Sequence, residues 1–349
     1  TDDYADIASV CAVSICVPTP LSKSREPDVS FIRRAASALS DVLEPPCLVV
    51  LESTTYPGTT REVLAPALSG RGRRLDENLF VAFSPERVDP GNEHFTIEST
   101  PKVVGGVSER STELVRALYG RVIDEVVEVR DARHAEMAKL LENTFRAVNI
   151  ALVNELAVMS DRMNLDIWEV IDAAATKPFG FMPFRPGPGI GGHCVPLDPL
   201  VLGWKAKTFG FHNRFIELAS DLNSEMPRFV VKKLVRLLND RGLPVRDTRI
   251  MLLGVAYKPD VGDVRESPAL DIWSTLEDWG AQLSYHDPFV AEFAGATSME
   301  LTDEVLDSVD AVVVVTDHGS IDYERVARLA PFVFDTRGVM AADDHVELL

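Results

Sequence analysis

Short apolar runs alternate with amphipathic stretches in the first third of the chain. The runs at residues 12–17, 47–51 and 79–83 are almost continuously apolar, and a helical pattern spans residues 29–43. A short acidic helix precedes the first run. Strands that are apolar on both faces and alternate with helices are typical of a parallel sheet covered on both sides. This pattern predicts an α/β domain over residues 1–130.

Polar residues follow each of these predicted strands. Pro18 and Thr19 end the first run, Ser53 and Thr54 follow the second, and Glu86 follows the third. Ligands of parallel sheets bind where the carboxyl ends of the strands meet. Each group alone could be an ordinary polar turn, but three in succession favour a binding site.

A long amphipathic helix is predicted over residues 137–163. Its apolar stripe repeats every three or four residues and comprises Leu140, Leu141, Phe145, Val148, Leu152, Leu156 and Met159. On a different face, Lys139 and Asn143 are four residues apart and are therefore neighbours. They could hold an oxyanion and a water. The alternative is a solvated lysine beside a surface asparagine.

A second helical region is predicted over residues 198–240, with a break at Met226 and Pro227. Helices with wide apolar faces between two α/β segments suggest a connector, which we assign to residues 131–245. Such faces can form a dimer, although burial within one chain would use them equally well.

The last segment, residues 246–349, again alternates strands with helices. Ser267 and Pro268 mark the start of a helix, and Gly280 marks its end. Strands are predicted at residues 249–257, 283–286, 311–316 and 332–335. The segment therefore predicts a second open parallel sheet.

Glycine and proline are most concentrated in residues 176–199. Proline fixes the backbone and glycine permits conformations that other residues avoid, so no regular element is expected there. A thiol, an imidazole and a carboxylate arrive together near its end, at His193, Cys194 and Asp198. This is the composition of a functional site.

Gly187, Gly189 and Gly192 in this loop match the pattern G-x-G-x-x-G. That pattern binds dinucleotides only where a strand precedes it and a helix follows it. Arg185 and Pro186 precede the match, so we reject it.

Cys194 is the candidate nucleophile. A lone cysteine is more often a small buried side chain, and that interpretation suits Cys11, Cys16 and Cys47, which lie in or beside apolar runs. Cys194 has no apolar neighbourhood before it and follows glycines whose amides could bind an oxyanion.

Composition narrows the class of protein. With 349 residues and 46% hydrophobic content, the chain can hold two or three domains. It has no run of about 18 apolar residues and no signal-like opening, so we expect a soluble protein that neither inserts into a membrane nor is secreted. Four cysteines without metal-like spacing argue against a zinc site and a disulfide scaffold. We expect no metal and a reducing, cytoplasmic environment.

The formal net charge of −19 argues against a nucleic-acid partner. An anionic ligand must then be bound by local cations. Lys258 and Arg265 lie in the loop after the first strand of the second predicted sheet and could supply them. Alternatively, they are ordinary surface charges.

Five ordered segments resemble the nucleotide-sugar 6-dehydrogenases, the UDP-glucose/UDP-N-acetylhexosamine/GDP-mannose dehydrogenase family: ESTTYPGTT, FSPERVDPG, AKLLENTFRAVNIALVNELA, GPGIGGHCVPLDP and GVAYKPDVGDVRESPA. The resemblance covers essentially the whole chain. It implies two Rossmann-like doubly wound domains joined by a helical dimerisation region, and oxidation of a sugar C6 alcohol to a carboxylate with NAD. The segments TKPFGFMPF and SPERVDPGN look most like the branch that acts on UDP-N-acetylglucosamine, with UDP-N-acetylmannosamine and UDP-glucose as alternatives.

The resemblance also implies catalytic roles. Cys194 would attack the intermediate aldehyde to form a thiohemiacetal and then a thioester. Lys139 and Asn143 would stabilise the oxyanion, and Asp198 would assist the base chemistry with Lys139. Thr54 with Glu86 would position water or serve as base; that completes the catalytic set.

Binding roles follow from the same resemblance. It implies a structural role for His193. Cofactor contacts are expected from Val17, Pro18, Thr19, Thr54 and Arg265, and substrate contacts from Lys139, Asn143, Phe184, Arg185, Gly191 and Lys258.

The chain departs from the family pattern in two places. Some UDP-glucose enzymes carry a second glutamate four places after the position of Glu86; Pro90 stands there, so Asp89 substitutes or no second carboxylate is needed. The glycine-rich loop of the first domain and its acidic ribose-binding residue are also absent from the sequence. Since each βαβ unit takes about 30 residues, we expect that roughly 60 residues of that domain are missing. The alternative function is therefore an inactive nucleotide-sugar-binding fragment.

Overall fold

The computed structural model describes residues 1, 3–22, 25–88 and 94–349, so Asp89 and Pro90 lie outside the described residues. The chain forms two compact units, which are described separately. The first comprises Thr1–Phe145 and Leu197–Asn213, and the second comprises Arg146–Pro196 and Arg214–Leu349. The residues predicted as a helical connector contribute to both units.

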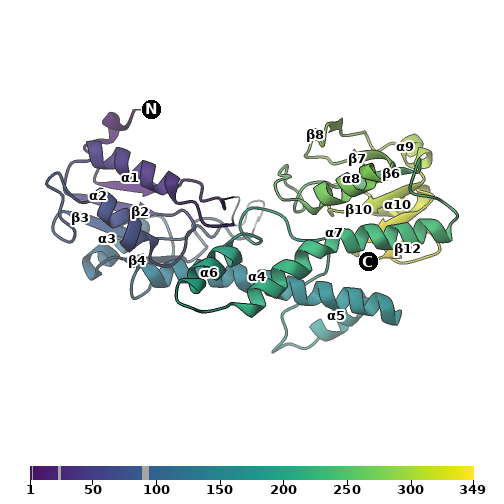
Figure 1. Ribbon diagram of the computed structural model, residues 1–349, viewed down its shortest axis with the longest axis horizontal. Helices are drawn as coiled ribbons and strands as arrows, with labels where there is room; N and C mark the ends of the chain where they lie inside the picture. Colours follow the sequence, from purple (N-terminus) through teal and green to yellow (C-terminus); the bar gives the residue numbers. More distant parts are fainter. Residues whose placement is uncertain (2, 23–24, 89–93) are drawn as a thin grey trace. The chain divides into compact units, whose positions relative to one another are not determined.

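A five-stranded sheet forms the centre of the first unit (Figure 1). Its strands, in spatial order, are β1 (Ala12–Ile15), β2 (Cys47–Leu51), β3 (Leu79–Phe83), β4 (Lys102–Gly106) and β5 (Val126–Glu128). β1, β2 and β3 are parallel, as predicted, whereas β4 is antiparallel to β3 and β5 is parallel to β4. The bounds predicted for β2 and β3 are confirmed, and β1 ends at Ile15 rather than at residue 17.

Helices cover both faces of this sheet. Ile32 and Leu39 of the first helix and Leu64 of the next helical segment pack on one face, and Val115 packs on the other. Each fully buried aliphatic side chain of this kind contributes about 1.5–3 kcal/mol. The helical elements are a 3₁₀ helix (Tyr4–Ile7), α1 (Ser30–Val42), a π-helical turn (Thr60–Leu64) that continues into α2 (Ala65–Leu68), α3 (Glu109–Tyr119), the first part of α4 (Ala132–Met163) and α6 (Asp198–Lys207).

Arg73 fastens the ends of α1 and α2 together. Its side chain is buried, with 4% of its surface exposed. The guanidinium donates to the main-chain carbonyls of Leu68, Leu43 and Ser40 at 2.9, 2.7 and 2.6 Å. These carbonyls lie at helix C-termini, where a cation satisfies otherwise unpaired acceptors.

The second unit contains an open sheet whose five strands are all parallel, as predicted. In spatial order they are β12 (Val346–Leu348), β11 (Val333–Asp335), β10 (Ala311–Val314), β6 (Arg249–Leu253) and β7 (Gln282–His286); β8 (Glu292–Phe293) and β9 (Ala296–Thr297) form a separate small hairpin. The strand predicted over 249–257 ends earlier because Gly254 adopts a φ of 77°. A Cβ at Gly254 would lie 2.2 Å from the carbonyl oxygen of Thr316.

The side chains of β6 alternate between two cores. Ile250 and Leu252 pack with α7 (Arg214–Asp240) and α8 (Pro268–Asp278), while Met251 and Leu253 pack with α9 (Asp303–Ser308) and α10 (Tyr323–Leu329). This alternation explains why the strand is apolar at successive positions. The helices of this unit are the rest of α4, α5 (Ile167–Ala175), α7 (Arg214–Asp240), α8 (Pro268–Asp278), α9 (Asp303–Ser308) and α10 (Tyr323–Leu329).

The ends of α8 agree with the predicted cap residues, but α7 does not break at the predicted proline. Ser267 caps α8 by accepting a hydrogen bond from Ala269, and Gly280 follows the helix with a φ of 86°, as predicted. The break predicted at Pro227 is wrong, because α7 continues through this residue. The chain instead breaks between α6 and α7, where Gly210 has a φ of 69°. Buried neighbours of Pro227 such as Val230 anchor α7 despite the missing N–H donor.

Across the described parts of the chain, no helix combines the length and the apolar character needed to cross a membrane.

Candidate active site

Three polar side chains predicted from the sequence come together in the first unit. Lys139 and Asn143 of α4 and Asp198 at the start of α6 are only 7%, 4% and 5% exposed. The side-chain amide of Asn143 donates a hydrogen bond to the Asp198 carboxylate. Leu140, packed with Tyr56 and Val201, holds α4 against α6. The alternative of a solvated lysine and a surface asparagine is therefore wrong.

The environment of Asp198 favours proton transfer near neutral pH. Burial raises the pKa of Asp198 to about 6, although the hydrogen bond from Asn143 and the charge of Lys139 both oppose this shift. A carboxylate with such a pKa is ionised at pH 7 and still takes up a proton readily. The neighbouring ammonium and amide can stabilise an oxyanion.

The loops after β1 and β2 are fastened to one another. The backbone N–H of Val17 donates to the Ser53 hydroxyl at 2.8 Å, and the Thr19 hydroxyl donates to the carbonyl of Thr54 at 2.5 Å. Ser53 is buried, and Pro18 is exposed at this edge. This edge lies at the carboxyl ends of parallel strands, where such sheets bind their ligands. The residues that would hold the pyrophosphate of NAD are not among this group.

Glu136 supports the second of these loops and was not predicted. It is completely buried, and its carboxylate accepts hydrogen bonds from the N–H of Gly58 at 2.5 Å and of Thr60 at 2.8 Å. The Thr60 hydroxyl donates a third bond at 2.7 Å. Burial raises the pKa of Glu136 to about 7 against the effect of these bonds. It lies one helical turn before Lys139, where a sequence pattern that begins at residue 137 could not reveal it.

A second unpredicted cluster surrounds Glu52 at the end of β2. Its carboxylate lies 2.8 Å from the Lys102 ammonium and accepts a hydrogen bond from the Tyr119 hydroxyl. Burial opposes ionisation, but the bonds from Lys102 and Tyr119 outweigh it and hold the pKa of Glu52 below its usual value. Because β4 is antiparallel, its first residue, Lys102, reaches this edge. A prediction based only on the residues that follow each strand does not include Lys102, because Lys102 begins a strand.

Glu86 does not join these groups. It is exposed and accepts a hydrogen bond from the N–H of Val88. Within the described residues, the structure records no contact between Glu86 and Thr54. The next residue, Arg87, instead forms an ion pair with Glu142 of α4 at 2.9 Å.

Cys194 is exposed and belongs to the second unit. The backbone before it is irregular, which confirms the rejection of the dinucleotide pattern. The N–H of Gly187 donates to the Asn154 side chain at 3.0 Å, and the N–H of Gly192 donates to the Arg265 carbonyl at 3.1 Å. These two amides are therefore engaged within the protein rather than presented to an oxyanion, which corrects our expectation for them.

The remaining predicted binding residues of the second unit do not converge on one point. Arg185 is exposed and forms an ion pair with Asp172, and Phe184 packs against the hydrophobic core. Lys258 is half-buried. Gly191 lies against Tyr257 and Glu266.

The main chain of Arg265 lies beside the loop that carries Cys194, because its carbonyl accepts the Gly192 N–H. Its guanidinium pairs with Asp263 at 2.6 Å. The pKa of Arg265 is raised, mainly by that hydrogen bond and also by the charge of Cys194. His193 is exposed and contributes to lowering the pKa of Asp263, for which Arg265 is the main cause.

The other cysteines divide differently from our expectation. Cys47 is buried in the sheet, as predicted, whereas Cys11 and Cys16 are exposed. They flank β1, which is the edge strand of the sheet and, among the described residues, has a neighbouring strand on one side only. Among the described residues, no group of three or more His, Cys, Asp or Glu side chains could hold a metal ion.

Comparison with known proteins identifies the family. Three models of the UDP-glucose/GDP-mannose dehydrogenase family match in order: the NAD binding domain at residues 1–123, the central domain at 133–225 and the UDP binding domain at 251–342. The chain is 36% identical over 293 residues to UDP-N-acetyl-D-glucosamine 6-dehydrogenase from Pseudomonas aeruginosa, covering 83% of this chain and 69% of that protein.

Solved structures agree with this match. The structure of UDP-D-ManNAc dehydrogenase from Pyrococcus horikoshii superposes with a TM-score of 0.89 at 32% identity and covers 100% of this chain and 82% of that chain. A UDP-glucose dehydrogenase from Pyrobaculum islandicum superposes with a TM-score of 0.81 at 27% identity and covers 97% of this chain and 78% of that chain. With its two Rossmann-like α/β units, this chain belongs to the UDP-glucose/GDP-mannose dehydrogenase family of NAD-dependent nucleotide-sugar oxidoreductases.

Proposed function

We propose that the chain oxidises the C6 hydroxyl of a UDP-N-acetylhexosamine to the carboxylate, with UDP-N-acetylglucosamine as the preferred substrate. The observation that carries this proposal is the buried cluster of Lys139, Asn143 and Asp198. Removal of a proton and a hydride from an alcohol needs a base beside an oxyanion stabiliser, which this cluster offers. The name of the Pseudomonas aeruginosa relative supports the choice of sugar.

The chain's own side chains would act as follows. Asp198, supported by Lys139, takes up the proton of the C6 hydroxyl, while Lys139 and Asn143 stabilise the oxygen as negative charge develops. The thiolate of Cys194 then adds to the aldehyde carbon and forms a thiohemiacetal. Oxidation of this adduct gives a thioester.

Water completes the reaction. It attacks the thioester carbon, and the carbon–sulfur bond breaks to release the carboxylate and the Cys194 thiol. NAD⁺, when bound, supplies the acceptor for each hydride. Overall, R–CH₂OH, two NAD⁺ and one water give R–COO⁻, two NADH and three protons.

The test uses purified protein with UDP-N-acetylglucosamine, UDP-N-acetylmannosamine and UDP-glucose, each supplied with NAD⁺. We expect the highest kcat/KM with the first sugar and two NADH for each uronate formed. One NADH with accumulating free aldehyde would contradict the thioester route. Highest activity with the second sugar would favour the substrate named for the Pyrococcus horikoshii relative.

The second candidate function is nucleotide-sugar binding without oxidation. It is favoured by one sequence feature, the absence of a glycine-rich loop between a strand and a helix, because pyrophosphate binds to such helix N-termini. Calorimetric titration with NAD⁺ separates the two functions. Binding as tight as that of a longer relative excludes the inactive fragment, while UDP-sugar binding without NAD⁺ binding supports it.

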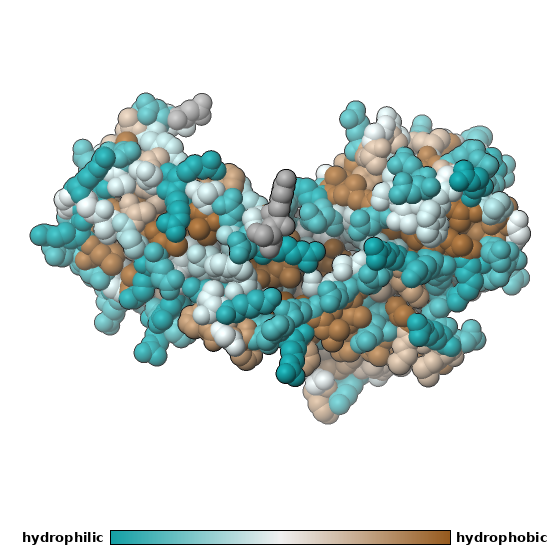
Figure 2. Space-filling view, in the orientation of Figure 1, coloured by the Kyte–Doolittle hydropathy of each residue, from teal (hydrophilic) through white to brown (hydrophobic). Residues whose placement is uncertain are grey.

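We also propose a homodimer formed through α4 and α7. Leu152, Met159, Phe215 and Leu218 are apolar and between 47% and 77% exposed. A groove of about 620 Å³ between the two helices is walled by residues such as Phe229. Figure 2 shows apolar surface in brown over the region where Figure 1 draws α4 and α5. An exposed apolar helix surface with such a groove is well suited to bind a second copy of the chain.

Light scattering tests the dimer. Leu152→Glu should reduce the measured mass from two chains to one, whereas Met299→Glu, at an exposed position outside both helices, should leave it unchanged. A wild-type mass of one chain at micromolar concentration would exclude the dimer.

Two further assignments complete the proposal. We propose that residues 1–130 bind NAD, residues 131–245 form the helical dimerisation and catalytic-loop segment, and residues 246–349 bind the UDP-sugar. Because the thioester route requires a reduced Cys194, we propose that the protein acts in the cytoplasm.

A further inference from the structure

The loop that carries Cys194 lies directly on the segment that follows β6. A Cβ at Gly191 would be 2.7 Å from both the Tyr257 Cβ and the carbonyl oxygen of Glu266, and a Cβ at Gly192 would be 2.8 Å from the Tyr257 ring. The N–H of Gly192 donates to the Arg265 carbonyl at 3.1 Å. The two glycines are therefore needed for close packing against Tyr257.

Hydrogen bonds hold the backbone on both sides of Tyr257. The N–H groups of Val255 and Ala256 donate to one oxygen of Asp287 at 2.7 and 3.0 Å, and the Thr316 hydroxyl donates to the Ala256 carbonyl at 2.6 Å. Beyond Tyr257, the N–H of Asp260 donates to His318 Nδ1 at 3.0 Å. Tyr257 and Lys258 are thus presented by a turn that is fixed at both ends.

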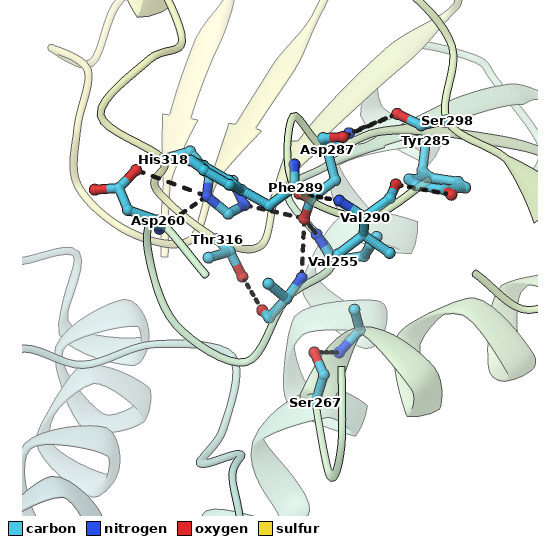
Figure 3. Close-up of polar contacts among 12 residues, drawn as sticks. Val255, Asp260, Ser267, Tyr285, Asp287, Phe289, Val290, Ser298, Thr316 and His318 are labelled. Atoms are coloured by element: carbon cyan, nitrogen blue, oxygen red, sulfur yellow. Dashed lines mark hydrogen bonds and ion pairs between the residues drawn. The ribbon is translucent and has the colours of Figure 1, made fainter. Parts of the chain in front are cut away.

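Asp287 and His318 join the two fixed ends (Figure 3). His318 Nε2 lies 2.9 Å from Asp287 Oδ2, and both side chains are completely buried. Because Nδ1 accepts the Asp260 N–H, the proton of the neutral imidazole is on Nε2 and is donated to Asp287. The other oxygen of Asp287 accepts from Phe289 and Val290 at 2.8 and 3.1 Å.

The Asp287 carboxylate is ionised in this network. Burial opposes its charge, but the hydrogen bonds from His318 and from the backbone of Val255, Phe289 and Ala256 outweigh burial and hold the pKa of Asp287 below its usual value. Charge-assisted bonds of this kind are stronger than bonds between neutral groups. The carboxyl ends of β6, β7 and β10 are tied together through this one side chain.

We propose that the Asp287–His318 pair and Tyr257 position the Cys194 thiol, by fixing the turn on which Gly191 and Gly192 rest. Tyr257, Asp287 and His318 are positioning residues. The positioning of Cys194 does not depend on which reaction the protein catalyses. The expected effect on turnover, however, rests on the proposed nucleophilic role of Cys194. The same turn presents Lys258, so the pair couples the thiol to a cation suited to a substrate diphosphate.

The experiment measures the alkylation rate of each cysteine by iodoacetamide at pH 7, followed by peptide mass spectrometry. The exposed Cys11 and Cys16 belong to the first unit and serve as internal references. We compare Tyr257→Ala with Tyr257→Phe, which keeps the ring. In Tyr257→Ala we expect Cys194 to react about fivefold more slowly, because a loosened loop moves the thiol away from the Arg265 cation that favours the thiolate.

His318→Leu supplies a second line of evidence. A leucine neither donates to Asp287 nor accepts from the Asp260 N–H, so we expect slower alkylation of Cys194 here too. If this buried substitution prevents folding, the half-buried Tyr257 still decides the question. For turnover, Tyr257→Ala should lower kcat about tenfold, with a smaller change in the KM of the UDP-sugar.

Unchanged Cys194 alkylation in Tyr257→Ala would overturn the inference, as would an equal slowing of Cys11 and Cys16. Slower alkylation confined to Cys194, absent in Tyr257→Phe, supports it. If that result appears while the wild-type protein oxidises none of the three UDP-sugars, the positioning stands and the proposed function fails.

Discussion

The side-chain amide of Asn143 donates a hydrogen bond to the carboxylate of Asp198, so α4 and α6 meet through two buried polar groups. An amide held in this way has its second N–H available for another acceptor. Lys139, one turn earlier on α4, is also buried, and its charge opposes the rise in the pKa of Asp198. The base, Asp198, therefore belongs to the same buried cluster as Lys139 and Asn143, which can stabilise negative charge.

Asp198 should set the acidic limb of the pH profile. Because burial raises its pKa to about 6, its basic form is lost below that pH, and kcat/KM should fall as the pH drops through about 6. Asp198→Asn should lower kcat about 10²–10⁴-fold and remove this limb. Steady-state rates from pH 5 to 9 measure both effects, with the exposed Asp41→Asn as control. An unaltered limb in Asp198→Asn would assign it to another group.

Glu136 should give the first unit a distinct dependence of stability on pH. Its pKa is raised from 4.5 to about 7 by burial, so folding favours the protonated form. This contribution is fully present below pH 4.5 and is lost as the pH rises through 7. The shift corresponds to about 3 kcal/mol.

Glu136→Gln should remove that dependence. The free energy of unfolding of the wild-type protein, relative to Glu136→Gln, should decrease by about 3 kcal/mol between pH 4.5 and 8. Urea unfolding at several pH values measures the difference, and the exposed Glu44→Gln should track the wild type. A difference that stays constant over this range would mean that Glu136 does not titrate there.

Cys194→Ala should abolish formation of the uronate. Without the thiol no thiohemiacetal can form, and we expect a loss of about 10³-fold or more. Chromatography of the sugar products measures the uronate directly, and Cys11→Ala should retain full activity. Uronate formation by Cys194→Ala at a rate near that of the wild type would exclude the covalent route.

Arg73→Lys should destabilise the first unit. A lysine cannot reproduce the fork that reaches the carbonyls at the ends of α1 and α2, so buried acceptors lose their donors. We expect a loss of about 2–4 kcal/mol. Thermal unfolding measures it, and Arg71→Lys is the matched control, since the Arg71 side chain is 63% exposed and should change stability by less than about 0.5 kcal/mol.

The elements that could be predicted are those whose signal is local. β2 and β3 are apolar at every position, and Ser267 with Pro268 begins α8, so pattern and cap chemistry were sufficient. The antiparallel direction of β4 was beyond reach, because strand direction depends on pairing with distant residues. For the same reason Lys102 could not be placed beside Glu52.

The candidate site was partly predictable for similar reasons. Spacing of four residues placed Lys139 and Asn143 on one face of a helix, and the structure adds their burial and the partner Asp198. Glu136 and the Asp287–His318 pair form bonds to backbone groups far away in the sequence. No local pattern reports such bonds, so these positioning groups appear only in the folded chain.

The place of β1 at the end of the first sheet affects how this chain must be handled. Within the described residues it pairs with β2 on one side only, so its other backbone edge can recruit a strand from a neighbouring molecule. Cys11 and Cys16 are exposed beside that edge, and two chains aligned there could become cross-linked by oxidation. Concentrated samples therefore need reductant, and light scattering in its absence should detect aggregates before any activity is lost.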